Sequence, residues 1–451
     1  MKIKKKPWPF LSLILIIFLA GGYYIYNLNT YRDKKVDPKI KRGESVSIFV
    51  TSDIHYLPDS INDHGEAFQR FVSLGDGKQT DYIEQITDAF INDIKKSKPQ
   101  FLIISGDLTS NGEKASHEEL IKKLHKIEEL GTSVYVIPGN HDILNPNARS
   151  FKGEDQYKTD YITNKDFPML YKDFGYNEAV SRDKKTLSYL VAPTEDTWFL
   201  MLDTAKYMNN IKNGSPEVGG QITKETFEWI KKCSDLAKAH NAKLITVMHH
   251  NLMDHSGVVK KDYTLDNSKD AIDEFTKDGI NLVLTGHIHI QNINSAQDNN
   301  TKIYDIATSS LAVYPQQYGI INYDKEKGYD YSTKSVDVEA YAKENGLKDK
   351  NLINFKSYSE GYFGDKAYDR AYENLASSGQ YTVEEIKAMS NIMRIVNLNY
   401  FAGTEYKIGD EIKNTEGFKL WEKDISMFQR NYILSIINGK KEDNTHLHIE
   451  K

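Results

Sequence analysis

Five runs of apolar, β-prone residues each end in polar side chains of the kind that bind metal ions. The runs are SIFVTSD, FLIISGD, SVYVIPGN, KLITVMHH and NLVLTGHIH, and they lie between residues 47 and 289. Amphipathic stretches such as 80–97 separate them, and alternating strands and helices indicate largely parallel strands joined by short connections. Parallel strands place their carboxyl ends at one edge of a sheet. We therefore expect an α/β fold that gathers these polar ends at one place.

The gathered side chains form a donor set suited to metal ions. Asp53 and His55 lie on the same face of a strand end, because strand side chains alternate with a period of two. Asp107 has two carboxylate oxygens and can bridge two ions. The expected ligands are Asp53, His55, Asp107, Asn140, one of His249 and His250, His287 and His289. Mixed imidazole and carboxylate ligands suit two ions of manganese, iron or zinc.

This donor set predicts chemistry on a phosphate ester. Two metal ions about 3.5–4 Å apart can activate water as a nucleophile and hold a phosphoryl oxygen. Because only two carboxylates oppose two cations, the centre stays positive and attracts an anion. His141 directly follows one ligand and can protonate a departing alkoxide as a general acid, with Asp142 as a candidate orienting carboxylate.

The order DxH, GD, GNHD, H and GHxH over residues 46–325 resembles the calcineurin-like metallophosphoesterases. The resemblance implies a β-sandwich flanked by helices, around a two-metal centre in which a metal-bridging hydroxide attacks phosphorus. It implies that one ion is held by Asp53, His55 and His289. It implies that the other ion is held by Asn140, His249 and His287. Asp107 would then bridge the two ions, and His141 matches the catalytic histidine of the family.

Ser110, three residues after Asp107, separates the branches of that family. Purple acid phosphatases have a metal-binding tyrosine there, and serine/threonine phosphatases have an aspartate followed by Arg-Gly. Without that aspartate, Asp142 or a backbone carbonyl must orient His141. The segments 202–204 and 219–222 (LDT and GGQI) instead resemble the bacterial class III cyclic nucleotide phosphodiesterases.

We therefore expect a phosphodiesterase that hydrolyses a small phosphodiester, with a cyclic nucleotide as the favoured substrate. One alternative is a phosphomonoesterase or pyrophosphatase acting on an extracytoplasmic substrate. Another is a catalytically inactive, membrane-tethered binding protein. The net charge of -6 and the pI near 6.1 argue against stable nucleic-acid binding, which requires a basic face. Nothing in the sequence indicates an oligomeric state.

The N-terminus has the pattern of a membrane segment. Lysines at positions 2 and 4–6 precede a charge-free stretch, 7–31, that is apolar over residues 10–26 and long enough to cross a bilayer. We expect residues 1–31 to be a signal anchor rather than a cleaved signal peptide, followed by a linker over 32–45. The catalytic domain would then lie outside the cell membrane, or be secreted if the segment is cleaved.

After the catalytic domain, predicted over residues 46–325, the pattern becomes helical. Thr382 and Glu385 form a capping box before an apolar helix face, and a last helix is predicted over about 416–437. We expect residues 330–451 to be a helical C-terminal domain. Its pattern indicates no function.

Overall fold

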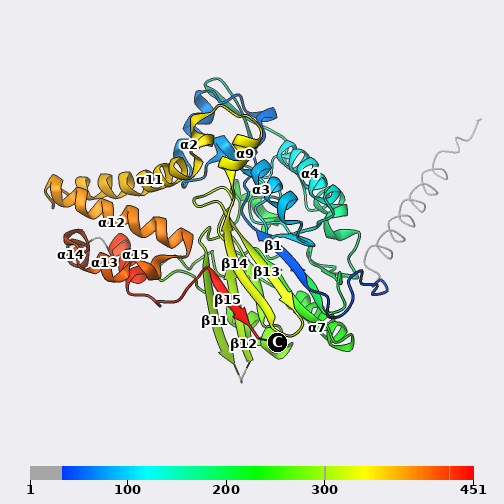
Figure 1. Ribbon diagram of the computed structural model, residues 1–451. Coiled ribbons are helices and arrows are strands. Elements are labelled where there is room, and N and C mark those ends of the chain that lie inside the picture. The colour runs from blue at the N-terminus through cyan, green and yellow to red at the C-terminus, as the bar shows by residue number, and fades with distance from the viewer. Residues whose placement is uncertain (1–32, 299–300, 426, 451) are drawn as a thin grey trace, which may run out of the picture.

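Two β-sheets face each other in the computed structural model, which describes residues 33–298, 301–425 and 427–450 (Figure 1). Helices cover the outer faces of the sheets, and a separate helical region follows, so the predicted α/β fold is confirmed in this form. The expected membrane segment, residues 1–31, lies outside the described residues. Among the residues that are described, no helix is long and apolar enough to cross a membrane.

The first sheet has a parallel centre and an antiparallel flank. Its order is β15-β14-β13-β1-β2-β3, and β1, β2 and β3 are parallel. The strands are β1 (Val46–Thr51), β2 (Phe101–Ile104), β3 (Ser133–Val136), β13 (Gln317–Asp324), β14 (Gly328–Ser335) and β15 (His446–Ile449). The connections between β1, β2 and β3 pass through α3 (Ile83–Ser97) and α4 (Lys114–Glu129).

The second sheet is also mixed. Its order is β11-β12-β10-β9-β8-β7-β6, with β8, β9, β10 and β12 parallel. The strands are β6 (Ser181–Arg182), β7 (Tyr189–Val191), β8 (Thr197–Leu202), β9 (Lys243–Met248), β10 (Leu282–Thr285), β11 (Asn292–Asp298) and β12 (Thr301–Ala307). A small hairpin, β4 (Arg149–Lys152) and β5 (Asp155–Lys158), stands apart from both sheets.

Alternating side chains explain why the two sheets pack as a sandwich. In β8, Phe199 points toward the first sheet, where its ring centroid lies 5.4 Å from that of Phe101 and 5.5 Å from that of Tyr135. Leu200 and Leu202 point the other way, into a second buried cluster under α7 (Lys224–Ala239) and α8 (Ser268–Lys277). Each strand therefore supplies two apolar layers, as period-two alternation requires.

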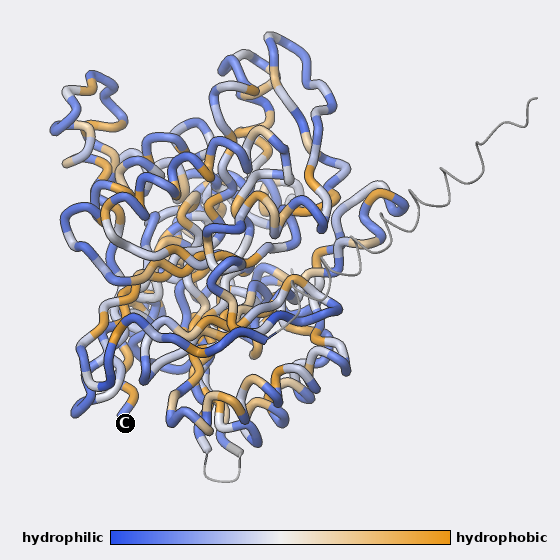
Figure 2. Tube along the Cα trace, turned by 90° about the vertical axis from the view of Figure 1, so that its right-hand side faces the viewer, coloured by the Kyte–Doolittle hydropathy of each residue, from blue (hydrophilic) through white to orange (hydrophobic). Residues whose placement is uncertain are grey.

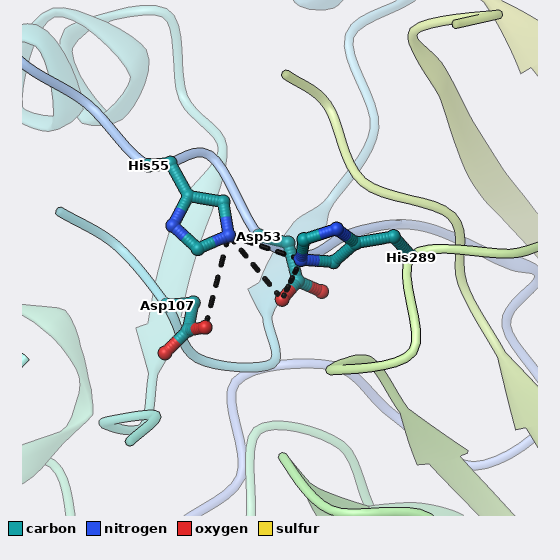
Figure 3. A group of neighbouring side chains, drawn as sticks. All are labelled: Asp53, His55, Asp107 and His289. Carbon is teal, nitrogen blue, oxygen red and sulfur yellow. Dashed lines mark hydrogen bonds and ion pairs between the residues drawn. The ribbon is translucent and has the colours of Figure 1, made fainter. Parts of the chain in front are cut away.

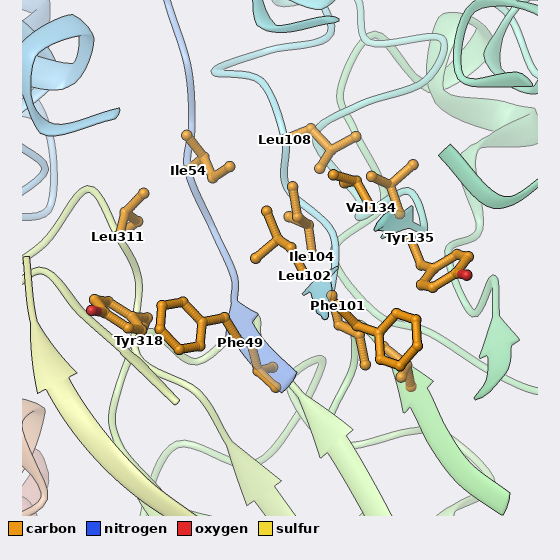
Figure 4. Close-up of a cluster of buried hydrophobic side chains, with 14 of the residues drawn as sticks. Phe49, Ile54, Phe101, Leu102, Ile104, Leu108, Val134, Tyr135, Leu311 and Tyr318 are labelled. Atoms are coloured by element: carbon orange, nitrogen blue, oxygen red, sulfur yellow. The ribbon is translucent and has the colours of Figure 1, made fainter. Parts of the chain in front are cut away.

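The outer face of the first sheet packs on helices in the same way. The ring of Phe49 lies 4.9 Å from that of Tyr318 (Figure 4). The Tyr318 ring in turn lies 5.0 Å from that of Phe90 on α3. Along the chain trace, the hydrophobic stretches run through the interior, and the outer turns of the helices are mostly hydrophilic (Figure 2). This packing holds the carboxyl ends of the parallel strands at fixed positions.

The C-terminal region is mainly helical, with a hairpin of two long helices extending from the sandwich (Figure 1). Its helices are α9 (Val338–Glu344), α10 (Lys350–Ile353), α11 (Phe355–Ser378), α12 (Val383–Ala402), α13 (Gly409–Lys413), α14 (Glu416–Lys423) and α15 (Met427–Ile437). The capping box of Thr382 and Glu385 forms as predicted. The helix predicted over 416–437 is instead two helices, α14 and α15.

The predicted boundary of the helical domain is wrong at both ends. Residues 330–335 belong to β14, and the chain returns to the first sheet as β15. In β14 the alternating residues Tyr329 and Tyr331 are buried, which is a period of two rather than of a helix. The helical region is therefore inserted between two strands of the sandwich.

The segment predicted as a linker, residues 32–45, is described from residue 33 and lies against the second sheet. The backbone of Lys34 donates to the carbonyl of Val180 at 2.8 Å, and Arg42 pairs with Asp196 at 2.7 Å. Ile40 forms an isolated bridge with Thr194. These contacts fix the direction in which the chain enters β1.

Candidate metal centre

All five polar motifs leave the carboxyl ends of strands. Those after β1, β2 and β3 come from the first sheet, and those after β9 and β10 come from the second. The sequence pattern led us to expect a single sheet edge. The structure instead brings together the matching ends of two facing sheets, so the donors converge from two sides.

The first donor group contains Asp53, His55, Asp107 and His289, whose ligand atoms all lie within 4.8 Å of one another (Figure 3). The Nε2 atoms of His55 and His289 are 3.1 Å apart. His289 Nε2 lies 3.3 Å from Asp53 Oδ1, and His55 Nε2 lies 3.7 Å from Asp107 Oδ2. Three loops therefore direct their donor atoms to one point.

The second donor group contains Asp107, His249 and His287. His249 Nε2 lies 3.4 Å from Asp107 Oδ2 and 3.0 Å from Asn140 Oδ1. Asn140 thus joins this group through its side-chain oxygen. Because Asp107 belongs to both groups, its carboxylate lies between them, as a bridging ligand must.

Backbone carbonyls orient the imidazoles of the second group. His249 Nδ1 lies 2.9 Å from the carbonyl of Ser105, and His287 Nε2 lies 3.0 Å from that of Asp262. When one ring nitrogen donates its proton to a carbonyl, the other nitrogen carries a free lone pair. The free nitrogens are Nε2 of His249 and Nδ1 of His287.

Backbone strain is concentrated in the same residues. Eleven described residues other than glycine have a positive φ, and five of them are members of the two donor groups. These five are Asp53, His55, Asp107, His287 and His289, with φ between 47° and 70°. The left-handed region costs such residues on the order of 1–3 kcal/mol each, and such strain is concentrated at functional sites. The fold therefore holds these donors in place rather than letting them relax.

The chemistry of the donor set fits a cation. Two imidazole nitrogens 3.1 Å apart share at most one proton, and Asp53 Oδ1 is buried without a hydrogen-bond partner. Burial by itself raises the pKa of Asp53 and of Asp107, but the neighbouring histidines hold both below the usual value. Burial by itself lowers the pKa of His249, but the charges of Asp107 and Asp53 and the hydrogen bonds to Asp107 and to the Ser105 carbonyl together outweigh it and raise the pKa to about 9. Positive charge is thus favourable at this point.

His141 lies beside the donor groups and is more open than they are. Its side chain is 26% exposed, whereas that of His55 is 1% exposed. His141 Nδ1 lies 2.7 Å from the carbonyl of Ser110, so its Nε2 is the nitrogen left for a reacting group. Burial lowers the pKa of His141, and the Asp107 charge opposes this shift.

Asp142, predicted as a candidate orienting carboxylate, does not take that position; the Ser110 carbonyl does. Asp142 instead accepts four hydrogen bonds, from the backbone N–H groups of Leu108, Thr109 and Gly139 and from the Thr109 hydroxyl, at 2.8 to 3.1 Å. Burial raises its pKa to about 7, although these bonds oppose the shift. Asp142 therefore joins the loop after β2 to the turn after β3.

Glycines permit the close approach of these loops. Gly106 has φ +97°, and a Cβ atom there would lie 2.6 Å from Nδ1 of His249. A Cβ atom on Gly139 would collide with the backbone nitrogen of Asp107. Any larger residue at either position would push a donor away from the group.

Two histidines outside the donor groups also have defined places. His250 lies 2.8 Å through Nδ1 from the Thr204 hydroxyl and 2.9 Å through Nε2 from the Val218 carbonyl, so both its nitrogens face other partners. His255 lies in the loop that follows His250. It is buried, and its Nε2 lies 3.0 Å from Asp305 Oδ2. The Asp305 carboxylate offsets the cost of its burial.

Comparison with known proteins assigns the family. Residues 46–291, more than half of the chain, match the family model described as calcineurin-like phosphoesterase. The chain is a calcineurin-like phosphoesterase. Residues 337–443 of this phosphoesterase match a second model, described as the C-terminal domain of cyclic nucleotide phosphodiesterase. The family and the two donor groups together make it a metal-dependent phosphoester hydrolase.

The phosphoesterase also resembles individual proteins. It is 26% identical over 189 residues to a "probable cyclic nucleotide phosphodiesterase" of Coxiella burnetii, over 42% of its own chain and 59% of the length of that relative. Among solved structures, a dimetal phosphatase from Danio rerio matches with a TM-score of 0.43 and 11% identity, over 66% of this chain and 96% of that one. The NAD nucleotidase of Haemophilus influenzae matches with a TM-score of 0.35 and 12% identity, over 64% and 49%.

Proposed function

We propose that this phosphoesterase hydrolyses a small phosphodiester, with a cyclic nucleotide as the favoured substrate class. The observation that carries the proposal is a carboxylate, Asp107, shared by two donor groups, beside an accessible imidazole, His141. The match of residues 337–443 to the C-terminal domain of cyclic nucleotide phosphodiesterase supports the substrate class.

In this proposal the two donor groups hold two metal ions. Asp53, His55 and His289 would hold one ion. Asn140, His249 and His287 would hold the other. Asp107 would contact both, and manganese, iron and zinc all suit these ligands. When bound, the ions supply an activated water and positive charge for the phosphoryl oxygens.

His141 is the proposed general acid. In hydrolysis, a bond forms between phosphorus and the water oxygen while the bond from phosphorus to the leaving ester oxygen breaks. The leaving oxygen must then take a proton. His141 Nδ1 faces the Ser110 carbonyl, which leaves Nε2 to carry that proton toward the open side of the site. Asp142 has no part in this transfer, since its oxygens accept backbone N–H groups.

The absence of arginine from the five motifs supports a diester rather than a monoester. A phosphodiester carries one negative charge, whereas a monoester dianion carries more charge for the site to neutralise. The test is hydrolysis of bis-p-nitrophenyl phosphate and of p-nitrophenyl phosphate by the manganese-loaded protein. We expect a higher kcat/KM for the diester, and a clear preference for the monoester would contradict the proposal.

A substrate panel sharpens the same test. It should contain 3',5'- and 2',3'-cyclic nucleotides, with the metal content measured on the same sample. We expect turnover of a cyclic nucleotide. Turnover of the artificial diester alone would point to another small phosphodiester.

We further propose that residues 1–31 attach the enzyme to the cell membrane, with the catalytic domain outside or secreted if the segment is cleaved. The lysine-rich start and the apolar stretch that follows it support this. Protease treatment of intact cells should degrade the catalytic domain if it is anchored outside. Full protection of an intact, membrane-bound protein would contradict this location.

A further inference from the structure

The loop over residues 75–79 connects the candidate metal centre to the helical region. It follows α2 (Glu66–Leu74) and ends at a 3-10 turn, Thr80–Tyr82. Gly77 has φ +82°, and a Cβ atom there would lie 2.6 Å from the ring of Phe363 on α11. The Phe363 ring thus rests directly on the backbone of this loop, which only glycine permits.

The end of the loop is tied to the backbone of two candidate ligands. Gln79 N–H donates to the carbonyl of Ala312 at 2.8 Å, and Ala312 N–H donates to the hydroxyl of Ser310 at 3.1 Å. The Ser310 hydroxyl donates to the carbonyl of Asp53 at 2.7 Å, and its N–H donates to that of His289 at 3.3 Å. The loop is therefore fixed relative to the first donor group.

The helical region holds the same residue from the other side. The Gln79 side-chain amide donates to the hydroxyl of Ser359 on α11 at 2.7 Å, and that hydroxyl donates to Gln316 Oε1 at 2.8 Å. Gln79 and Ser359 are both buried. This buried series of hydrogen bonds sets the distance between the loop and α11.

Lys78 lies between these two anchored residues. Its side chain is half-buried, and no ion pair or hydrogen bond engages its ammonium within the described parts of the chain. Its neighbour Asp76, by contrast, pairs with Arg370 at 3.2 Å. The next residue, Gln79, is tied through Ala312 and Ser310 to the backbone of Asp53 and His289, so this anchor places Lys78 beside the first donor group. Burial lowers the pKa of His55 and of His141, and the Lys78 charge lowers both further, in keeping with that position.

We propose that Lys78 binds an oxygen of the substrate phosphoryl group, and that Phe363 and Ser359 position Lys78 for this contact. The proposal rests on the proposed function, since it names a further residue of the same site. A lysine ammonium is a compact charge that binds phosphate oxygens well. The helical region, none of whose described residues belongs to the two donor groups, thereby contributes to substrate binding through one helix.

The contact is to a non-bridging oxygen, which diesters and monoesters both possess. Lys78 therefore binds both classes and is not the source of the proposed preference for a diester. Its attraction is stronger for a dianion, because the Coulomb attraction grows with charge.

The test compares Lys78→Met with Lys78→Arg and with Lys232→Met on α7, an exposed lysine far from the five motifs in the sequence. For each manganese-loaded protein, the affinity for inorganic phosphate is measured by calorimetry, together with metal content and melting temperature. We expect Lys78→Met to weaken phosphate binding roughly 10- to 100-fold, the loss of one charge-assisted hydrogen bond. We expect Lys78→Arg to retain part of the affinity, with metal content unchanged in all three.

Steady-state kinetics on bis-p-nitrophenyl phosphate separate this proposal from the proposed function. If no diester is hydrolysed but Lys78→Met still weakens phosphate binding, the substrate class is wrong and the Lys78 assignment stands. If diester hydrolysis and phosphate affinity are the same in Lys78→Met and Lys232→Met, the Lys78 assignment is overturned and the function stands.

The positioning role of Phe363 has its own readout. Phe363→Ala should weaken phosphate binding in the wild-type background, with the metal content unchanged. It should have no further effect in the Lys78→Met background, since residues that act through one another are not additive. An equal loss in both backgrounds would show that Phe363 acts independently of Lys78.

Discussion

The sandwich and the helical region serve the site in different ways. Each side chain proposed to bind metal or carry a proton lies on the sandwich between residues 53 and 289, whereas α9 to α15 supply none. The helical region reaches the same place by packing. Ile288, between His287 and His289, shares a buried cluster with Met389 and Trp421, and Phe363 rests on Gly77.

The two regions therefore contribute to the site through different kinds of contact. Strand ends place polar donors with a fixed direction, because the sheets hold the strands and short strained loops follow. The helices contribute apolar faces, which pack against those loops and restrict their movement. Substitutions in the two regions should therefore have separable effects on metal content and on stability.

The largest effect is expected from Asp107→Ala, which removes the carboxylate shared by both donor groups. The variant should lose at least one ion, and diester hydrolysis should fall by more than about 1,000-fold, since several kcal/mol of charge stabilisation is lost. Metal analysis and initial rates on one sample measure both. Asp410→Ala on α13 is the matched control, because that aspartate is exposed and belongs to the helical region. Two bound ions in Asp107→Ala would refute its bridging position.

Asp142→Ala should act on stability as well as on the site. It leaves three buried backbone N–H groups without their acceptor, and the free energy of unfolding should fall by about 3–5 kcal/mol. Urea denaturation measures the loss. Asp142→Asn, which keeps one acceptor oxygen, should lie between wild type and alanine. If Asp142→Ala loses no more stability than the substitution of an exposed aspartate, Asp142 does not hold the loop after β2 to the turn after β3.

Ile288→Ala tests how the sandwich and the helical region are connected, because Ile288 lies within a polar motif but packs into the helical core. We expect a loss of about 2–3 kcal/mol in the free energy of unfolding, as for a buried side chain cut back to alanine. Metal content should stay close to wild type. Ile288→Val should lose well under half as much, and loss of an ion from the valine variant would mean that helical packing itself holds the ligands.

The smallest effect on the free energy of unfolding is expected for a substitution of Glu405 in the helical region, and it depends on pH. Burial raises its pKa to about 7, with Oε1 accepting from Asn444 at 2.7 Å. The unfolded state ionises at a lower pH than the folded state, so stability is lost as the pH rises from about 4.5 to 7. Glu405→Gln should flatten this dependence and stabilise the protein by about 1–2 kcal/mol at pH 8.

Urea midpoints at pH 5 and pH 8 measure this difference, and metal content should not change with the substitution. If Glu405→Gln keeps the full pH dependence of the wild type, the titrating group lies elsewhere.

Much of the site could be predicted from sequence, because the signal is local. An apolar run followed by a polar pair, as in residues 48–55, identifies both the strand and the side chains at its end. The pairing of strands is not local, so the division of the motifs between two sheets could not be read from these runs. The same limit hid β15, which pairs with β14 more than 100 residues away.

Contacts made by backbone atoms and by charges far apart in the chain could not be predicted from the sequence either. The partner of His141 is the Ser110 carbonyl, and a carbonyl has no sequence signature. His255 is buried beside Asp305, and the two residues are far apart in the chain. The place of Lys78 could not be predicted from the sequence either, since only the folded contacts of Gly77 and Gln79 bring it to the site.

The most direct test of the proposed mechanism, in which His141 is the general acid beside two metal ions, is His141→Ala. Metal content and bis-p-nitrophenyl phosphate turnover are measured on one sample. The backbone N–H of residue 141 donates to Asp107 Oδ1 at 2.9 Å, and this bond survives the substitution. His125→Ala on α4 is the control. We predict two bound ions and a kcat about 100- to 10,000-fold lower, as for the loss of a general acid. Unchanged turnover with both ions bound would contradict the account.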